Sequence, residues 1–274
     1  MKFNANLAEK PWGQLGVPHL GDSHAGDRRI GEVSFEHPHG LSLPVLVKYL
    51  YTSERLSIQV HPDDQQARAF GHECGKDEMW IVLAAEPGAT IGLGLKQSYE
   101  PDVVAAAIAD GAIVDLVDWR PVRRGEVIYN RAGTIHAAGA GLVLLEVQQS
   151  IDLTYRLFDY GRPRELHLAE GLAVSRFEPH HDPRDCQLGK GESRVLADGP
   201  HFGAAWCAGG LPEGLPVNPD HWQLVVVSGT ASIGGLSLSE GEAAYTQSLV
   251  GLTMARDAVV MLAWPAQKSM AEAA

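Results

Sequence analysis

Short apolar runs recur along the chain, and most are bounded by glycine, proline, asparagine or aspartate. The runs are rich in valine, isoleucine and leucine, and this rhythm of brief apolar segments and turn residues is typical of all-β proteins. It leaves little room for long helices. We expect strands at 31–36, 43–51, 56–60, 79–84, 126–129, 142–149, 154–158, 203–207, 222–228, 230–233 and 258–263.

One segment departs from this rhythm. The sequence EPDVVAAAIADG, residues 100–111, has Pro101 near its start and Gly111 at its end. Proline is favoured in the first turn of a helix and glycine just after its last turn. The sequence therefore predicts an all-β fold interrupted by a few short helices.

The sequence also indicates two β units. Residues 175–200 are polar and rich in turn residues, which favours a connection between units. On both sides of this stretch a strand leads through a turn and a short strand to a glycine–glutamate pair, at 125–126 and again at 241–242. We therefore expect one domain at 1–175 and a second at 176–274.

Charge and composition narrow the class of function. The formal net charge of −12 argues against a general nucleic-acid binder, because such proteins need a basic face to neutralise phosphates. A small anionic substrate held by a few local cations remains compatible with this charge. Hydrophobic residues are 45% of the chain and charged residues 20%, which is ordinary globular composition.

The cysteines and the apolar runs bear on the compartment. Cys74, Cys186 and Cys207 are an odd number without CxxC spacing, so they indicate neither a disulfide framework nor a structural zinc knuckle. No run approaches the ~18 apolar residues of a membrane span, and MKFNANLAEKPWGQLG lacks the apolar segment of a secretion signal. We expect a cytoplasmic protein without a membrane or nucleic-acid partner.

Two polar residues share one strand face in IQVHPDD, residues 58–64. Because side chains two positions apart point to the same face of a strand, Gln59 and His61 would project side by side, and Pro62 would end the strand. Such a pair is compatible with a solvated face or with a binding site. Partners elsewhere in the chain must decide between these interpretations.

Two further residues offer suitable ligand atoms. Glu78 lies at the start of the strand EMWIVLAA, and His136 lies in a glycine-bounded segment that we expect to be a turn between strands. Together with Gln59 and His61 they would supply a neutral oxygen, two imidazole nitrogens and one carboxylate. This set suits zinc or another divalent ion, although spacing in the sequence alone cannot show that the four side chains converge.

Several long motifs resemble one enzyme family. The segments KPWG, LPVLVKYL, LSIQVHPDD, GKDEMWIVLAAEPGA and NRAGTIHAAGAGLVLLEVQQSIDLTYRLFDYGRPRELH are similar to those of the type I mannose-6-phosphate isomerases, which belong to the cupin superfamily. The resemblance covers residues 9–170, and the segment between Glu78 and His136 has room for only one helix, as in the short bacterial form. It implies two cupin-like β-barrel or jelly-roll units, the second of them degenerate and without a metal.

The resemblance also implies a function and a metal site. A member of this family would interconvert mannose 6-phosphate and fructose 6-phosphate through an enediol and would bind one Zn²⁺ per chain. Position by position, the family's metal ligands fall on Gln59, His61, Glu78 and His136. The resemblance gives no indication of the oligomeric state.

The remaining site residues follow from the resemblance and from simple chemistry. The family's T-Y-R arginine falls on Arg156, whose planar guanidinium suits a phosphate, and Lys76 could add a point charge. Ser57 and Lys48 stand where pocket residues are expected. In GLVLLEVQQS, alternation places Glu146 on a face with Leu144 and Gln148, and Glu146 would act as a general base or orient one.

Two other functions remain open from the sequence. Two histidines and one carboxylate also resemble the ligand set of non-haem iron oxygenases, which makes a metal-dependent cupin oxygenase an alternative. A non-catalytic sugar-phosphate binder with the same fold is another. Other histidines lie in loops without an alternating strand pattern, and we do not expect them to bind a metal: His37, His39, His72, His180 and His181.

Overall fold

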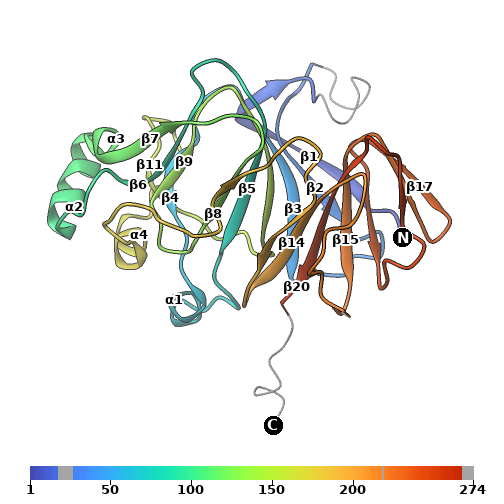
Figure 1. Cartoon of the computed structure of the whole chain (residues 1–274). Coiled ribbons are helices and arrows are strands. Elements are labelled where there is room, and N and C mark those ends of the chain that lie inside the picture. The colour runs from blue at the N-terminus through green and yellow to red at the C-terminus, as the bar shows by residue number, and fades with distance from the viewer. Residues whose placement is uncertain (18–26, 218, 267–274) are drawn as a thin grey trace, which may run out of the picture.

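A computed structural model describes residues 1–17, 27–217 and 219–266 (Figure 1). The strands are β1 (Asn4–Leu15), β2 (Arg29–Glu36), β3 (Val45–Thr52), β4 (Ile58–Val60), β5 (Glu78–Ala85), β6 (Thr90–Leu95), β7 (Val117–Pro121), β8 (Glu126–Asn130), β9 (His136–Ala138), β10 (Leu142–Gln149), β11 (Tyr155–Phe158), β12 (Cys186–Gln187), β13 (Arg194–Asp198), β14 (Phe202–Ala208), β15 (Trp222–Ser228), β16 (Thr230–Ile233), β17 (Leu236–Ser239), β18 (Ala243–Thr246), β19 (Thr253–Met254) and β20 (Val259–Pro265). The helices are α1 (Asp64–Ala69), α2 (Pro101–Asp110), α3 (Ile113–Leu116) and α4 (Leu168–Val174).

Strands dominate the structure, so the predicted all-β class with a few short helices is confirmed. Within the described residues the strands form four sheets, whose ladders are antiparallel. A seven-stranded sheet has the order β1-β2-β3-β10-β5-β8-β12, and a five-stranded sheet has the order β11-β4-β9-β6-β7. A second five-stranded sheet is β13-β14-β20-β15-β18, and β17-β16-β19 form the fourth sheet.

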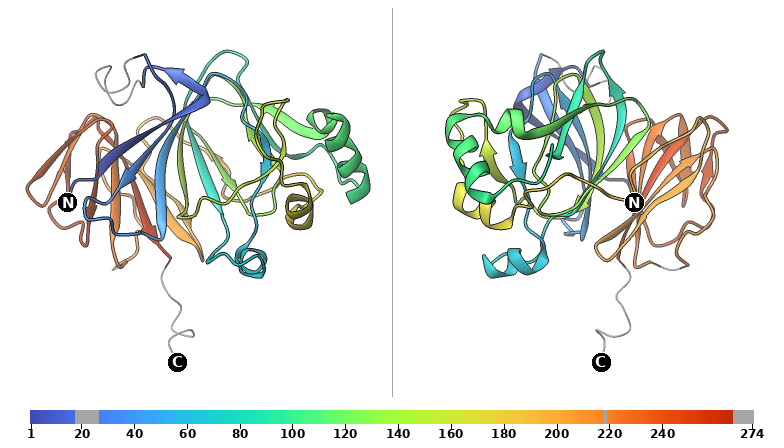
Figure 2. Two further views of the ribbon diagram at one scale, coloured as in Figure 1. Left: turned by 180° about the vertical axis from the view of Figure 1, so that it is seen from behind. Right: turned by 60° about the vertical axis from the view of Figure 1, so that its left-hand side comes forward.

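The sheets stack as layers, and an apolar core lies between neighbouring sheets. Trp80 and Leu144 of the seven-stranded sheet pack with Leu93 of the sheet that contains β4 and β9. The opposite face of the seven-stranded sheet packs through Met79 onto Phe202 and its neighbours in the third sheet. Helices α2, α3 and α4 lie at one end of this stack, and β17 lies at the other end (Figures 1 and 2).

Residue alternation along β5 and β10 agrees with the sequence. Trp80 of β5 and Leu144 of β10 face one core layer, whereas Met79 and Val147 face the layer on the other side. Glu146 lies on the same face as Leu144, as its position in the strand predicts. The two strands therefore have one face toward the second sheet and one toward the third.

Each expected strand coincides with an observed one to within two residues at either end, and the predicted helix is α2. Several observed strands were not predicted. Half of the residues of the long β1 are exposed and it contains Pro11, whereas β6 alternates Ile91, Leu93 and Leu95 with Gly92 and Gly94, and glycine is uncommon in strands. Gly92 in β6 is needed because a Cβ there would press against the Val117 side chain.

The glycine–glutamate pairs occupy equivalent places in the two halves. The N–H of Gly125 donates to Val82 in β5, and that of Gly241 donates to Val226 in β15, each at 2.8 Å. Each glycine has a positive φ, which other residues rarely adopt. The division into domains at 1–175 and 176–274 stays a prediction. Among the described helices, none combines the length and apolar character needed to cross a bilayer.

Candidate metal centre and substrate cavity

The strand β4 directs its side chains to two different environments. Ile58 and Val60 are fully buried in the core beneath the helices, so Gln59 and His61 point the other way, toward the seven-stranded sheet. Pro62 follows at once, and Asp63 caps the first turn of α1 with its side chain. The predicted shared face of Gln59 and His61 is therefore present.

The strand β9 brings His136 beside this face. His136 is the first residue of β9 and pairs in register with Gln59 across the β4–β9 ladder. We expected His136 in a turn, and that expectation is wrong. The glycine-bounded segment is extended because β9 pairs with both β4 and β6, which a sequence with few alternating residues does not reveal.

Glu78 approaches from the opposite sheet and completes a cluster of three buried ligand candidates. One carboxylate oxygen lies 3.4 Å from His61 Nε2, and the other lies 3.2 Å from His136 Nε2. One ligand atom from each of the three residues fits within 4.8 Å of the others, and each residue is at most 1% exposed. The structure thus brings together His61, Glu78 and His136, which lie far apart in the chain.

The hydrogen bonds of the two histidines show which ring nitrogens are free to bind a cation. His61 Nδ1 is 2.8 Å from the Leu153 carbonyl, and His136 Nδ1 is 2.8 Å from the Thr134 carbonyl. Because a carbonyl only accepts, each Nδ1 carries the proton, and each Nε2 of a neutral ring turns a lone pair toward Glu78. Glu78 Oε2 is buried, and it lies 3.0 Å from the Lys76 ammonium and 3.4 Å from His61 Nε2. Acceptors that face one another in a buried site fit a metal ion between them.

Burial controls the charge of these groups. It lowers the pKa of His61 to about 3, with help from the Lys76 ammonium, and it also lowers the pKa of His136. Burial opposes ionisation of Glu78, but Lys76 and the two imidazoles hold the pKa of this carboxyl well below its usual range. At neutral pH the cluster therefore offers two neutral nitrogens and one carboxylate, which are the forms that bind metals.

Gln59 lies beside the three other candidates. Its Nε2 is 3.2 Å from His136 Nε2, and its Oε1 accepts a hydrogen bond of 3.1 Å from Ser57 Oγ. Amide oxygen and nitrogen are assigned from such contacts, and exchanging them would turn the oxygen toward the cluster while the Ser57 hydroxyl accepts instead. Gln59 can therefore offer a neutral oxygen, with Ser57 as the group that orients it.

Lys76 also lies against the cluster. Its ammonium is 3.0 Å from Glu78 Oε2 and 3.3 Å from His61 Nε2, and the residue is only 5% exposed. Lys76 and Glu78 point to the same side because they are two positions apart in extended backbone. The sequence suggested Lys76 as a charge for phosphate, whereas the structure places it at the metal candidates.

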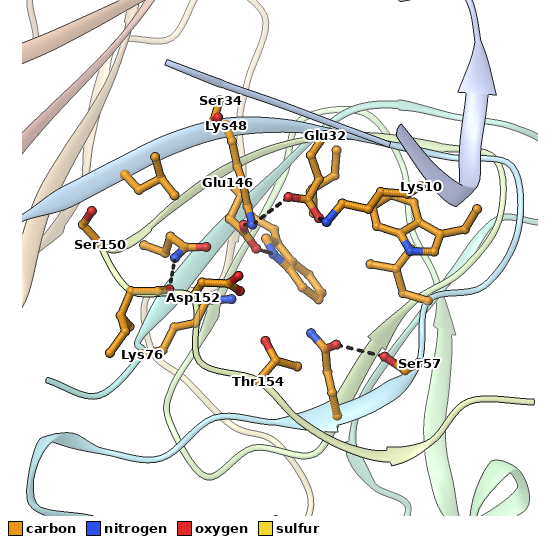
Figure 3. Close-up of a pocket in the computed structure, with 18 of the residues that line it drawn as sticks. Lys10, Glu32, Ser34, Lys48, Ser57, Lys76, Glu146, Ser150, Asp152 and Thr154 are labelled. Atoms are coloured by element: carbon orange, nitrogen blue, oxygen red, sulfur yellow. Dashed lines mark hydrogen bonds and ion pairs between the residues drawn. The ribbon is translucent and has the colours of Figure 1, made fainter. Parts of the chain in front are cut away.

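A cavity of about 530 Å³ opens beside the cluster and is lined by Ser57, Gln59, Lys76 and Arg156 among others. Figure 3 shows Lys10, Glu32, Lys48 and Glu146 gathered on one side of it. Lys48 Nζ is 2.7 Å from Glu146 and 3.8 Å from Glu32, which is itself 3.1 Å from Lys10. The sequence did not single out Lys10 or Glu32, although Lys10 belongs to the KPWG motif.

Glu146 is held from two sides. Lys48 contacts one carboxylate oxygen, and the Trp80 indole N–H donates to the other at 2.7 Å. Burial raises the pKa of Glu146, and the negative charge of Glu78 adds to this effect. Burial opposes the charge of Lys48, yet Glu146 and Glu32 raise its pKa above the usual range. Glu146 is thus a buried, fixed carboxyl at the cavity wall.

Arg156 lies on β11, directly across from Gln59 in the β4–β11 ladder. Among the described residues its guanidinium has no acidic partner, although Arg164 pairs with Asp159 at 2.6 Å and Arg162 pairs with Asp159 and Glu54. Arg164 lines the cavity together with Arg156. Arg156 is therefore a cation at the cavity whose charge is available to an anion.

The loop histidines lie elsewhere, in structural contacts. His180 is 3.1 Å from Asp185, and His37 packs edge-on against Tyr245. Cys74 is partly exposed and Cys207 is buried, and both are free thiols. None of these residues lines the cavity beside the cluster.

Comparisons with known proteins give one consistent result. No protein-family model matches the chain. A mannose-6-phosphate isomerase of Streptococcus mutans is 34% identical over 195 residues, and the match covers 68% of this chain and 60% of that protein. A mannose-6-phosphate isomerase of Bacillus subtilis (strain 168) is 34% identical over 162 residues, covering 54% of this chain and 51% of that protein. The matches therefore span only about half to three fifths of these relatives.

Solved structures extend the similarity to nearly the whole chain. The mannose 6-phosphate isomerase from Bacillus subtilis superposes with a TM-score of 0.74 at 21% identity, covering 96% of this chain and 98% of that one. A variant of the phosphomannose isomerase from Salmonella typhimurium gives a TM-score of 0.75 at 14% identity, covering 97% of this chain and 99% of that one. The chain shares this fold across both halves.

Replacing His61 should remove the metal. His61→Ala deletes one of two imidazole ligands from a buried site, so we expect metal content to fall from about one ion per chain to a small fraction. Atomic absorption on purified protein measures this. His181→Ala, which changes an exposed loop histidine, should keep full metal content. A His61→Ala protein with wild-type metal content would contradict the ligand assignment.

The metal-free protein should lose stability as the pH falls below about 6.5. The unfolded chain protonates His61 near pH 6.5, but burial keeps it neutral in the folded state down to about pH 3. In this window the unfolded state binds an additional proton at His61, so this residue alone lowers the free energy of unfolding by up to about 1.4 kcal/mol per pH unit, and His136 acts in the same direction.

Denaturant titrations with a chelator present, at several pH values between about 7 and 4, measure this slope. His61→Gln should give a shallower slope than the wild type, whereas His181→Gln should leave it unchanged. An unaltered slope in His61→Gln would show that His61 is not the group responsible.

Proposed function

The chain is homologous in sequence and in fold to the mannose-6-phosphate isomerases, and we propose that it is a metal-dependent isomerase that interconverts mannose 6-phosphate and fructose 6-phosphate. The observation that carries this proposal is the position of Arg156. A cation without an acidic partner among the described residues lines the same cavity as Gln59 and Lys76, and these two residues contact the buried group of His61, Glu78 and His136. A sugar phosphate needs both features.

Zinc is the ion that we propose, at one per chain. Two imidazole nitrogens and one carboxylate, with Gln59 as a neutral oxygen donor, form a ligand set that zinc favours. With a single anionic ligand the site would keep a net charge of about +1. A bound ion would supply an electrophile for the negative charge that develops on the sugar oxygens.

Aldose–ketose interconversion moves a proton between C1 and C2 of the open-chain sugar through an enediol. This step needs a group that takes the proton and returns it. We assign Glu146 to this transfer, either as the base or as the group that orients it, because burial brings its pKa closer to neutral pH. Lys48 and the Trp80 indole hold its two oxygens in place.

The cations of the cavity divide into two groups in this proposal. Arg156 holds the phosphate through two parallel charge-assisted hydrogen bonds. Lys76, which contacts Glu78 and His61, acts at the reacting end of the sugar rather than at the phosphate. Ser57 contributes to substrate binding at the cavity wall and orients Gln59.

The division into domains and the cellular compartment are also proposals. We propose a catalytic domain at 1–175 that binds the metal, and a metal-free second domain at 176–274 of the same cupin-like type. The small number of cysteines favours the cytoplasm. The substrate would be a small sugar phosphate, with no nucleic acid or membrane as a partner.

A metal-dependent oxygenase is the second candidate, because two histidines and one carboxylate also suit non-haem iron. Metal analysis of the purified protein, combined with assays for mannose 6-phosphate conversion and for oxygen uptake, separates the candidates. Zinc with isomerase turnover supports the proposed function. Iron with oxygen consumption would replace it by the oxygenase, and metal binding without either activity would favour a sugar-phosphate binder.

Replacing Arg156 should weaken catalysis on the phosphorylated sugar. Arg156→Ala removes the proposed phosphate anchor, so kcat/KM should fall by about 10² or more while metal content stays at the wild-type level. Inhibition by inorganic phosphate should weaken in parallel. Arg194→Ala, which changes an exposed arginine on β13, serves as the control. Near-normal kinetics in Arg156→Ala would rule out this role.

A further inference from the structure

Asp77 lies between Lys76 and Glu78 but turns its side chain the opposite way. Alternation directs the neighbours on either side toward the metal candidates, so the Asp77 carboxylate points to the far face of the sheet. It is only 8% exposed. A buried carboxylate is costly unless it is hydrogen-bonded, and its partners therefore show what it does.

The Asp77 carboxylate binds the segment that leads to His136. One oxygen accepts the Ala132 N–H at 2.9 Å, and the other accepts the Tyr129 hydroxyl at 2.9 Å. Next in the chain, the Gly133 N–H donates to the His61 carbonyl at 2.8 Å. Asn130, from the same segment, donates to Glu78 Oε1 at 2.8 Å. Residues 129–133 are thus tied to both other ligand-bearing segments.

The backbone of Asp77 is linked to the segment that follows His61. The Asp77 N–H donates to Gln149 Oε1 at 2.8 Å, and Gln149 Nε2 donates to Asp64 Oδ1 at 2.9 Å. The Gly75 N–H donates to the same Asp64 oxygen at 2.8 Å. Gly75 packs so closely on residues 62–64 that a Cβ there would overlap the Asp63 backbone.

Tyr129 connects this network to the chain that leads into the third sheet. The Arg184 guanidinium lies over the Tyr129 ring, 3.2 Å from its centroid, and Asp182 holds that guanidinium at 2.8 Å. Asp182 also contacts Arg131 at 3.1 Å. On β14, Phe202 stacks on the Tyr129 ring with centroids 5.6 Å apart. Residues 182–202 therefore cover the far side of the metal-binding segments.

We propose that Asp77 and Tyr129 are positioning residues that fix the three metal-binding segments relative to one another, and that residues 182–202 hold them in place. This inference rests on the metal site of the proposed function. It assigns a task to the chain beyond the first 175 residues: that part clamps the ligand strands from the face opposite the cavity.

Asp77 and Tyr129 together with residues 182–202 form what we call the clamp. It would affect the metal by fixing the positions of the ligands, because the Asp77 and Tyr129 side chains bind the segments that carry the ligands rather than the ligand atoms. Metal affinity depends on how closely the ligand atoms are held at the required separation, and groups that orient ligands typically contribute about 10- to 100-fold to affinity. Losing the Tyr129 hydroxyl would leave one oxygen of a buried carboxylate without its donor. The segments could then relax apart, and the metal would bind more weakly.

Tyr129→Phe tests the proposal, with Tyr51→Phe as a matched control. Both tyrosines are buried in the same core layer, but the Tyr51 hydroxyl has no hydrogen-bond partner within the described part of the chain. We expect Tyr129→Phe to bind Zn²⁺ about tenfold more weakly in competition with a chromogenic chelator. The kcat for the sugar phosphate should fall while KM stays close to the wild-type value. Tyr51→Phe should match the wild type in both measurements.

Asp77→Asn provides a second variant in case Tyr129→Phe folds poorly. It keeps the shape of the side chain and removes its charge, and it should weaken Zn²⁺ binding in the same direction. A thermal melt of each variant without metal separates positioning from general stability. If both variants melt at lower temperature yet bind Zn²⁺ as tightly as the wild type, the clamp is structural only and the proposal is wrong.

The wild-type protein separates this inference from the proposed function. Zn²⁺ binding without isomerase activity would refute the proposed function, while the affinities of Tyr129→Phe and Asp77→Asn would still decide whether the clamp exists. A wild-type protein that binds no divalent ion would refute the clamp together with the metal site.

Discussion

The buried carboxylate of Glu78, which faces two imidazole nitrogens, is the interaction on which the rest of the site depends. The neutral rings of His61 and His136 donate their Nδ1 protons to backbone carbonyls. Their Nε2 lone pairs therefore point at the Glu78 carboxylate, which is itself an acceptor. This arrangement needs positive charge close by, and the Lys76 ammonium supplies it at 3.0 Å from Glu78. The segments that carry His61, Glu78 and His136 must therefore keep fixed positions, and the hydrogen bonds of Asp77 and Gly133 hold these segments together.

The alternation of side chains along β5 and β10 gives the seven-stranded sheet one face with polar site residues and one apolar face. One face of β5 and β10 carries Trp80 and Glu146, which line the cavity, and Glu78, which contacts His136 on the neighbouring sheet. The other face carries Met79 and its neighbours, which pack onto the third sheet. Asp77, which directly precedes β5, turns a polar side chain to that apolar side, and its hydrogen bonds account for its burial there.

The cavity differs in charge from the protein as a whole. The chain has a formal charge of −12, yet five cationic side chains line the cavity against four acidic ones. The cations of its wall are mostly neutralised by their neighbours, as Lys48 is by Glu146. Among the described residues Arg156 of β11 has no acidic partner, so its charge is available to an anionic group that enters the cavity. Local pairing of charges thus leaves a cation available in the cavity of an acidic protein.

The sequence by itself determined which side chains share a face. A strand repeats every two residues whatever surrounds it, so the pairing of Gln59 with His61 and of Glu146 with Leu144 could be predicted from spacing alone. The motifs that resemble known isomerases identified the four ligand candidates. The expected strands agree with observed ones to within two residues, but β1, β6 and β9 were missed, because β1 contains Pro11, β6 contains two glycines and β9 has only three residues.

Only the tertiary structure decided which faces meet. The ladder that sets Gln59 beside His136, and the stacking that brings Glu78 from another sheet, join residues far apart in sequence. Such contacts follow from burial of whole sheets against one another, which no local pattern encodes. The same holds for Lys76, whose ammonium turned out to lie at the metal candidates, and for Asp77, whose role depends on Tyr129 and on segments contributed by three different parts of the chain.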